Sequence, residues 1–130
     1  MGRGTYGILL AQRDQNPLKG SRVLVVSSTL SPAEHADVQI LGRDFVSRIA
    51  ALKSEAVKDV WLFGGGQLFR TLLDEGLVDS VELAVIPVLI GSGIPVIPPG
   101  RHTRLRFKKC VSCPSGIQIL SNTCSPPIPA

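Results

Sequence analysis

The sequence predicts an α/β domain in which helices flank a mixed sheet, and three patterns indicate this fold class. Residues 23–26 and 60–63 are apolar runs without period-2 alternation, as expected for strands buried on both faces. Between and after these runs, apolar residues recur at helical spacing. The last part of the chain carries two alternating segments around a Pro-Ser-Gly turn, which is typical of an antiparallel hairpin. Early strands that alternate with helices and a closing antiparallel pair favour a three-layer fold.

Local signals place the individual elements. Phe45, Val46, Ile49 and Leu52 fall on one face of a single helix. Pro87 interrupts a β-rich run, which argues for a sheet edge or a bulge there. The elements expected in chain order are a loop entering a short helix (2–10), a strand (22–28), a short helix start (31–34), a short strand (38–41), a helix (43–55), a strand (57–63), a helix (67–75) and three strands (81–90, 102–111 and 116–121).

The expected domain spans residues 1–121, and residues 122–130, with three prolines, are expected to form a disordered tail. Within the domain, the helix at 67–75 should connect the strands at 57–63 and 81–90 as a right-handed crossover. This connection makes the strand at 57–63 the centre of the predicted sheet.

The glycine cluster after residue 63 is the strongest functional signal in the chain. Gly64, Gly65 and Gly66 lead from the expected central strand into a helix that Gly76 should end as a C-cap. A strand that turns through glycines into a helix presents free backbone N–H groups and a positive helix end, which together bind phosphate. Without further evidence, the glycines agree equally well with a turn that serves only tight packing of the helix on the strand. The spacing matches neither a dinucleotide-binding Rossmann fingerprint nor a Walker loop, because Phe69 stands at the third glycine position and no Gly-Lys-Ser/Thr follows.

Composition narrows the class of protein. The net charge of +4 is concentrated in residues 101–109, which hold five basic residues and no acid. There Leu105 and Phe107 alternate with basic side chains, as in an edge strand with one solvated face. A polyanion-binding face is the alternative, although the stacking aromatics of a nucleic-acid binder are absent. No apolar run has the length of a membrane span. An odd count of three cysteines favours reduced thiols and a cytoplasmic location.

Cysteine and histidine patterns indicate no metal or redox centre. Cys110 and Cys113 have redox-motif spacing, but Pro114 and Gly116 place a turn where a thioredoxin-like motif needs a helix N-terminus. A structural zinc site needs four ligands, and these two cysteines lack a complete partner set. We therefore expect no metal.

The order of four motifs carries a resemblance to a known family. The motifs are Gly2-Arg3-x-Thr5-Tyr6, a strand ending in Ser27-Ser28, Phe63-Gly-Gly-Gly-Gln-Leu-Phe69, and Ile86-Pro-Val-Leu-Ile-Gly-Ser-Gly-Ile-Pro95. Residues 1 to about 121 thereby resemble the dihydrofolate-reductase-like superfamily, in the branch of the C-terminal reductase domain of riboflavin biosynthesis. The Gly-Arg-x-Thr-Tyr start is more similar to stand-alone dihydrofolate reductase family proteins.

The resemblance implies NADPH-dependent hydride transfer to a small heterocyclic substrate, pterin- or pyrimidine-like, as in 5-amino-6-(5-phosphoribosylamino)uracil reductase. It implies that Gly2, Arg3 and Thr5 open a helix whose N-terminus holds cofactor phosphate; a solvated surface role is the alternative for Arg3. Ser27 and Ser28 would lie near the ribose 2′-phosphate, or else serve the turn. The residues that would follow the pyrophosphate and nicotinamide are Gly64, Gly65, Gly66, Gln67 and Leu68. A cytoplasmic homodimer fits the resemblance, without a nucleic-acid or membrane partner.

The chain departs from the family pattern at its start. Gly4 replaces a bulkier residue, and the strand and loop that precede the Gly-Arg-x-Thr motif in relatives are not found before it. We therefore expect an N-terminally truncated sheet that leaves residues 57–63 and 81–90 facing a gap, and we assign no catalytic residue. The alternative function is a truncated, non-catalytic protein that binds nucleotide or dimerises.

Overall fold

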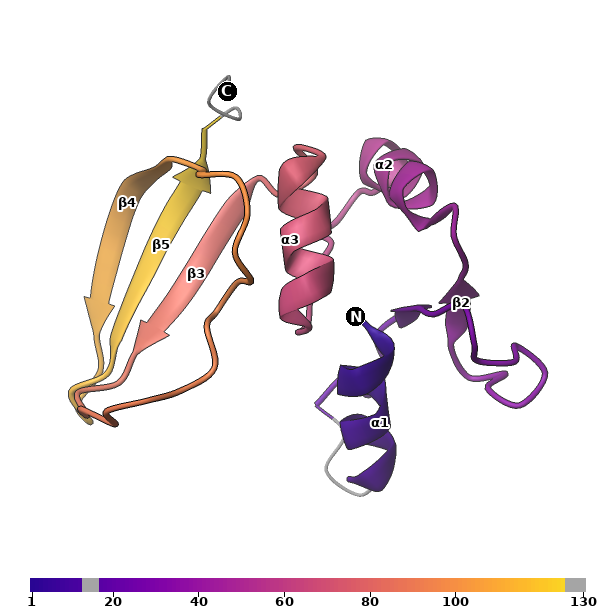
Figure 1. Cartoon of the computed structure of the whole chain (residues 1–130), viewed down its shortest axis with the longest axis horizontal. Helices are drawn as coiled ribbons and strands as arrows, with labels where there is room; N and C mark the ends of the chain where they lie inside the picture. The colour runs from indigo at the N-terminus through magenta and orange to yellow at the C-terminus, as the bar shows by residue number, and fades with distance from the viewer. Residues whose placement is uncertain (13–16, 126–130) are drawn as a thin grey trace. The chain divides into compact units, whose positions relative to one another are not determined.

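The computed structural model describes residues 1–12 and 17–125, which fold into α-helices and β-strands in two compact units, Met1–Phe69 and Arg70–Ala130. The α/β class and the antiparallel C-terminal strands predicted above are confirmed. The elements, labelled in Figure 1, are α1 (Arg3–Ala11), β1 (Leu24–Val26), β2 (Gln39–Leu41), α2 (Phe45–Glu55), α3 (Gly66–Asp74), β3 (Ser80–Val85), β4 (Leu105–Ser112) and β5 (Gln118–Cys124).

The first unit is built on parallel strands. β1 pairs with β2 in parallel, with Val25 opposite Ile40. The start of the chain lies along the other edge of β1, because the Val26 N–H donates to the Met1 carbonyl at 2.9 Å and the Ser27 N–H donates to Leu41 on the opposite side. The buried apolar side chains of this part include Tyr6, Val25 and Leu41, and Val25 is 0% exposed. This burial agrees with the prediction of a buried first strand.

The helix start expected at 31–34 is wrong, since only hydrogen-bonded turns form there. The Glu34 N–H reaches the Ser31 carbonyl at 3.2 Å, and the His35 N–H reaches that of Pro32 at 3.3 Å, without continuing into a helix. The turn instead brings the His35 ring against Tyr6, whose hydroxyl lies 3.2 Å from Nδ1. The short segment is therefore anchored by a side-chain contact rather than by helical bonds.

The central strand expected at 57–63 is also wrong, because these residues form no strand in the structure. A strand needs the backbone groups of a neighbour, and none of the described strands pairs with this segment. Val60 and Trp61 are exposed, and the Trp61 ring packs edge-on against Phe63 at 5.0 Å. The expected crossover to the strand after α3 is consequently not formed.

Helix α3 ends as the glycine signal predicts. Gly76 has a φ of +68°, its N–H donates to Leu73, and the Leu77 N–H donates to Leu72 at 2.8 Å. These two bonds make a Schellman cap, which satisfies carbonyls that the helix end leaves without partners. In the helix, Arg70 pairs with Asp74 one turn later.

The second unit holds a three-stranded antiparallel sheet in the order β3-β5-β4 (Figure 1). The hairpin turn predicted between the last two strands is present, with the Gly116 N–H donating to Cys113. β4 lies at an edge, as its charges predicted, and the register shifts between Phe107 and Lys109. β3 occupies the other edge and ends at Val85, so the strand predicted at 81–90 is wrong beyond that residue. Pro87 has no N–H to donate to a ladder, which agrees with the interruption expected there.

Residues 122–124, which were predicted to belong to a disordered tail, lie in a strand instead. β5 continues to Cys124, because Asn122 and Thr123 still pair with both neighbouring strands. Residues 126–130 lie outside the described part of the chain. No helix within residues 1–12 and 17–125 combines the length and apolar character that crossing a membrane requires.

Candidate functional site

Three parallel segments of the first unit end at the same edge. Gly2 bridges Val26 in parallel, and β1 pairs with β2, so each segment runs in the same direction. The residues that follow their ends are Arg3, Ser27 and Gly42, respectively. Ligands of α/β folds bind where the carboxyl ends of parallel strands open into loops. The topology therefore collects the loops most suited to binding at one edge.

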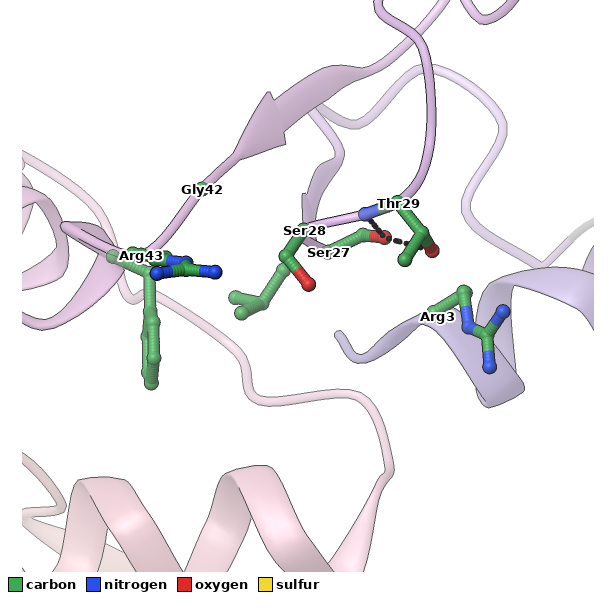
Figure 2. Close-up of a pocket in the computed structure, with 8 residues that line it drawn as sticks. Arg3, Ser27, Ser28, Thr29, Gly42 and Arg43 are labelled. Atoms are coloured by element: carbon green, nitrogen blue, oxygen red, sulfur yellow. Dashed lines mark hydrogen bonds between the residues drawn. The ribbon is translucent and has the colours of Figure 1, made fainter.

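A cavity of about 390 Å³ opens at this edge. Figure 2 shows Ser28 between Arg3 and Arg43, which come from different segments. Its lining consists of Arg3, Val26, Ser27, Ser28, Thr29, Gly42, Arg43 and Phe45. The cavity thus combines two guanidinium groups, three hydroxyl side chains and one aromatic ring.

The two predicted serines differ in what their side chains do. The Ser27 hydroxyl oxygen accepts hydrogen bonds from the N–H groups of Thr29 at 3.2 Å and Leu30 at 3.1 Å, so it stabilises the turn after β1. This is the turn role weighed above as the alternative. Ser28 is exposed and lies on the cavity wall. Of the two side chains, Ser28 is the one placed to meet a ligand.

The acid that follows Arg43 in the sequence is the N-cap residue of α2 and is paired with a different arginine. Asp44 follows Arg43 directly, but its carboxylate accepts from Arg48 Nε at 2.9 Å, one helical turn away. Arg43 and Arg3 are both exposed. A planar guanidinium binds two oxygens of a phosphate at once, and hydroxyl groups add further donors. This donor set suits a phosphate group.

The glycine turn lies against the first turn of α1. Gly64 and Gly65 have φ values of +74° and +92°, which side-chain-bearing residues rarely adopt. A Cβ atom at Gly64 would lie 2.9 Å from both Oγ1 and Cγ2 of Thr5. At Gly65 it would lie 3.8 Å from the Gly2 nitrogen. Glycine is thus required at Gly64 by conformation and by space together.

Two helix N-termini meet at this contact. Gly2 is the N-cap residue of α1, and no side chain caps that end by a hydrogen bond. The Gly65 carbonyl accepts the Phe69 N–H at 2.9 Å, so Gly65 holds the corresponding position at the start of α3. The N-terminus of a helix carries a partial positive charge and N–H groups that can bind an anion, so the convergence of two such ends favours an anion with more than one phosphate. Alongside, the Met1 amino group donates to the Leu24 carbonyl at 2.9 Å, and burial lowers the pKa of this amine.

The residues predicted from sequence fall into two groups around the start of α1. Arg3, Ser27 and Ser28 line the cavity, while Gly2, Thr5, Gly64 and Gly65 lie at the helix-end contact. The remaining predicted residues are Gly66, Gln67 and Leu68, which form the first turn of α3. Gln67 is exposed, whereas Leu68 is buried, with 8% of its surface exposed. Leu68 therefore packs inside the unit and offers only its backbone at the helix start.

Sequence reasoning missed Thr29, Gly42, Arg43 and Phe45, which also line the cavity. The signal for Arg43 was present, because it follows a short apolar strand and precedes a helix, as Ser27 and Ser28 follow the first strand. Among residues 1–12 and 17–125, no group of three His, Cys, Asp or Glu side chains could hold a metal ion.

Comparison with known proteins places this geometry in a family. The profile of the RibD C-terminal domain matches residues 11–119. The protein YwjB of Bacillus subtilis is 28% identical over 109 residues, which cover 83% of this chain and 63% of YwjB. YyaP of the same organism is 38% identical over 53 residues, covering 41% of this chain and 28% of YyaP. The chain thus spans less than two thirds of the length of these relatives.

Solved structures show the same fold. A protein of Shewanella sp. PV-4, named for riboflavin biosynthesis, matches 97% of this chain and 72% of its own length, with a TM-score of 0.81 at 22% identity. A pyrimidine reductase-like protein of Corynebacterium diphtheriae matches 79% of this chain and 50% of its own, with a TM-score of 0.59 at 18% identity.

Proposed function

The chain belongs to the RibD C-terminal domain family, a reductase-like family of the riboflavin pathway, and on that premise we propose that it is an NADPH-dependent reductase domain. The observation that carries the proposal is the meeting of two helix N-termini at Gly2 and Gly65 beside a cavity lined by two arginines. A dinucleotide with three phosphates needs positive charge at two separated places. The first unit supplies both around the start of α1.

The residues divide between these two places. Gly2, Gly64, Gly65 and the first turn of α3 would hold the pyrophosphate through backbone N–H groups, since no Cβ blocks the approach at the glycines. Ser28 and Arg43 would hold the ribose 2′-phosphate, and Phe45 provides an apolar face beside them. Arg3 lies at the first turn of α1 and lines the cavity as well, so we assign it to both phosphate groups.

Bound NADPH supplies a hydride, and the protein's part is to bind and orient the cofactor and exclude water from it. We propose a heterocyclic substrate of the pterin or pyrimidine kind, which the name of the Corynebacterium relative supports. We assign the reaction to the cytoplasm, on the odd number of cysteines. No described side chain is assigned as the proton donor.

Cofactor titration followed by the emission of Trp61, the single tryptophan, tests the proposal. Trp61 belongs to the first unit and precedes Gly64 by three residues. NADPH should quench it saturably and bind more tightly than NADH, because only NADPH carries the 2′-phosphate. Loss of one charge-assisted contact costs about 1.5–3 kcal/mol, or roughly a 10- to 100-fold rise in Kd.

Two arginine variants and a matched control sharpen the test. Arg43→Ala should weaken the binding of NADPH and leave the binding of NADH unchanged. Arg3→Ala should weaken the binding of both cofactors. Arg22→Ala removes the same charge at the opposite end of β1, where Arg22 donates to Gln39 at 2.7 Å, and should change neither Kd. A folded protein that binds neither cofactor would refute the proposal.

The second candidate is a protein that binds nucleotide without catalysis, and the same arginine-lined cavity favours it. Saturable NADPH binding without oxidation of NADPH, across pterin and pyrimidine substrates, would select this candidate. Turnover of any of them would exclude it.

A further inference from the structure

Strand β4, at one edge of the β3-β5-β4 sheet, has a free side along its length. Among the described strands it pairs with β5 alone, and all eight of its residues, Leu105–Ser112, are exposed. Figure 1 shows it as the outermost strand of this sheet. Such an edge presents unpaired backbone N–H and C=O groups, to which an extended segment of another protein can add as a further strand. The free side of β4 is therefore a surface on which a strand can pair.

An irregularity in β4 gathers its basic side chains on one face. Arg106 is paired with Thr123 and Lys109 with Ser121, and these two alternate residues of β5 point to the same face. Residues three apart on a regular strand would point to opposite faces. The register shift between Phe107 and Lys109 inserts one extra residue and thereby turns Lys109 to the face of Arg106. The bulge thus concentrates positive charge on one side of the edge.

Neighbouring residues leave this charge without a counterion. Residues 101–112 contain no acid, and within the described part of the chain neither Arg106 nor Lys109 forms an ion pair. Glu82 points to the same face, but its strand β3 is separated from β4 by β5, a distance of about 9–10 Å at the usual strand spacing. Its carboxylate accepts a hydrogen bond from the Ser121 hydroxyl at 2.9 Å. The basic face of β4 is consequently open to an acidic ligand from outside the sheet.

The opposite face of β4 begins with apolar side chains. Leu105 and Phe107 are paired with Cys124 and Asn122, which alternate along β5 with the residues opposite the basic side chains. Phe107 is 61% exposed and Leu105 is 38% exposed. A strand laid beside β4 would therefore meet positive charge on one face and apolar side chains on the other.

We propose that β4 binds an extended acidic segment of a partner protein as the fourth strand of this sheet. Side chains of neighbouring strands that point to the same face lie in contact, and opposite charges there stabilise the pair. A segment in which acidic and apolar residues alternate places its acids beside Arg106 and Lys109 and its apolar side chains beside Phe107. Backbone hydrogen bonds supply the affinity for the segment, and its alternation supplies the specificity.

Two other occupants match less of this surface. Strand β4 of a second copy would set basic side chains against basic side chains, which is unfavourable across a pair of strands. A nucleic acid would contact the basic face alone, and it would leave Phe107 and the free backbone groups uncovered. An acidic, alternating strand complements the charge, the apolar face and the backbone together.

Fluorescence anisotropy with a labelled peptide tests the proposal on the full chain without cofactor, so the result does not depend on the proposed function. The probe is a peptide of alternating glutamate and valine with the length of β4. One control peptide has the same composition with the glutamates and valines in separate blocks, and a second carries N-methyl groups that remove its backbone donors. The third control is an oligothymidylate of equal charge.

Each control should bind at least about tenfold more weakly than the alternating peptide. A control that binds as tightly as the alternating peptide would show that charge alone is recognised, and would overturn the proposal. The absence of saturable binding of the alternating peptide up to about 1 mM would also overturn it.

Charge reversal on β4 locates the binding. Arg106→Glu/Lys109→Glu should weaken binding of the alternating peptide at least about tenfold, because like charges then face each other. Lys19→Glu/Lys58→Glu makes the same change of net charge at exposed lysines of the first unit and should leave the Kd unchanged. A peptide with lysine in place of glutamate should bind the β4 variant more tightly than the wild type, which loss of folding could not produce. Equal weakening by the two double variants, or no gain with the lysine peptide, would refute the assignment to β4.

Discussion

Replacing Gly64 with alanine should destabilise the first unit far more than the same change at Gly65. Both glycines have positive φ, so each alanine carries a backbone penalty. Only at Gly64 does the new methyl group also meet an obstacle, at 2.9 Å from Oγ1 and Cγ2 of Thr5. At Gly65 the closest atoms are at 3.8 Å, an ordinary van der Waals distance.

The magnitude follows from these two contributions. A left-handed backbone conformation costs about 1–2 kcal/mol for a residue with a Cβ. Overpacking against a fixed side chain adds about 1–3 kcal/mol. Rotation about χ1 of Thr5 does not remove the clash with the new methyl group. Two of the three staggered positions on the Thr5 Cβ carry heavy atoms, so at least one of the two positions that face Gly64 stays occupied in every rotamer. Gly64→Ala should therefore cost about 2–5 kcal/mol and Gly65→Ala about 1–2 kcal/mol.

A double-mutant cycle with Thr5→Ala separates the two contributions. Thr5→Ala removes both obstructing atoms and leaves the Thr5 Cβ at 3.5 Å from the methyl position. The coupling between the two substitutions should recover about 1–3 kcal/mol of the Gly64→Ala penalty, and none should be seen with Gly65→Ala. Urea unfolding followed by Trp61 measures this, because its emission reports on the unit that holds all three residues.

Equal destabilisation by the two glycine variants would refute the reasoning. So would a Gly64→Ala penalty that Thr5→Ala leaves unchanged. Either result would mean that the turn does not press against α1 in solution, and the convergence of the two helix ends would lose its support.

Two further predictions concern helix ends and the pH dependence of stability. Gly7 lies within α1 with open space around it, so Gly7→Ala should stabilise the protein by about 0.5–1 kcal/mol. Gly76→Ala should destabilise the protein by about 1–2 kcal/mol, because a φ of +68° is strained for alanine. The midpoints of urea unfolding measure both changes. Burial, followed by the nearby Asp79 carboxylate, raises the pKa of the Cys124 thiol above its ordinary value of 9.0. The unfolded chain therefore releases this proton at a lower pH than the folded chain, so stability should be constant at neutral pH and fall as the pH rises through 9. Cys124→Ala should remove this part of the dependence of stability on pH. An unchanged dependence in the variant would contradict the assignment to Cys124.

The features that sequence predicted well depend on short-range physics. Gly76 ends a helix because only a residue tolerant of positive φ fits the position after the last turn. The hairpin of β4 and β5 follows from alternation around a turn, and the charges of β4 predicted its edge position. The glycine turn predicted before α3 is present, with positive φ at Gly64 and Gly65, while phosphate binding there stays a prediction.

The features that sequence did not predict depend on pairing between distant segments. The apolar run at 60–63 has strong strand character, but a strand exists only where a neighbour satisfies its backbone groups. Arg43 lies beside the cavity that Ser28 lines because β2 runs parallel to β1, and this pairing between distant segments is not specified by the local sequence. The role of Ser27 likewise depends on a turn geometry that the Ser-Ser-Thr sequence does not specify.

The contact between Gly2 and Gly65 joins residues near opposite ends of the first unit's sequence. Forming it closes almost the entire unit into one loop, and loop entropy makes such a contact unfavourable until other contacts have formed. A ligand held between the two helix ends therefore finds its site only after the unit has folded. Such a ligand should leave the folding rate unchanged and slow unfolding, so its main effect on the protein's lifetime would be resistance to proteolysis.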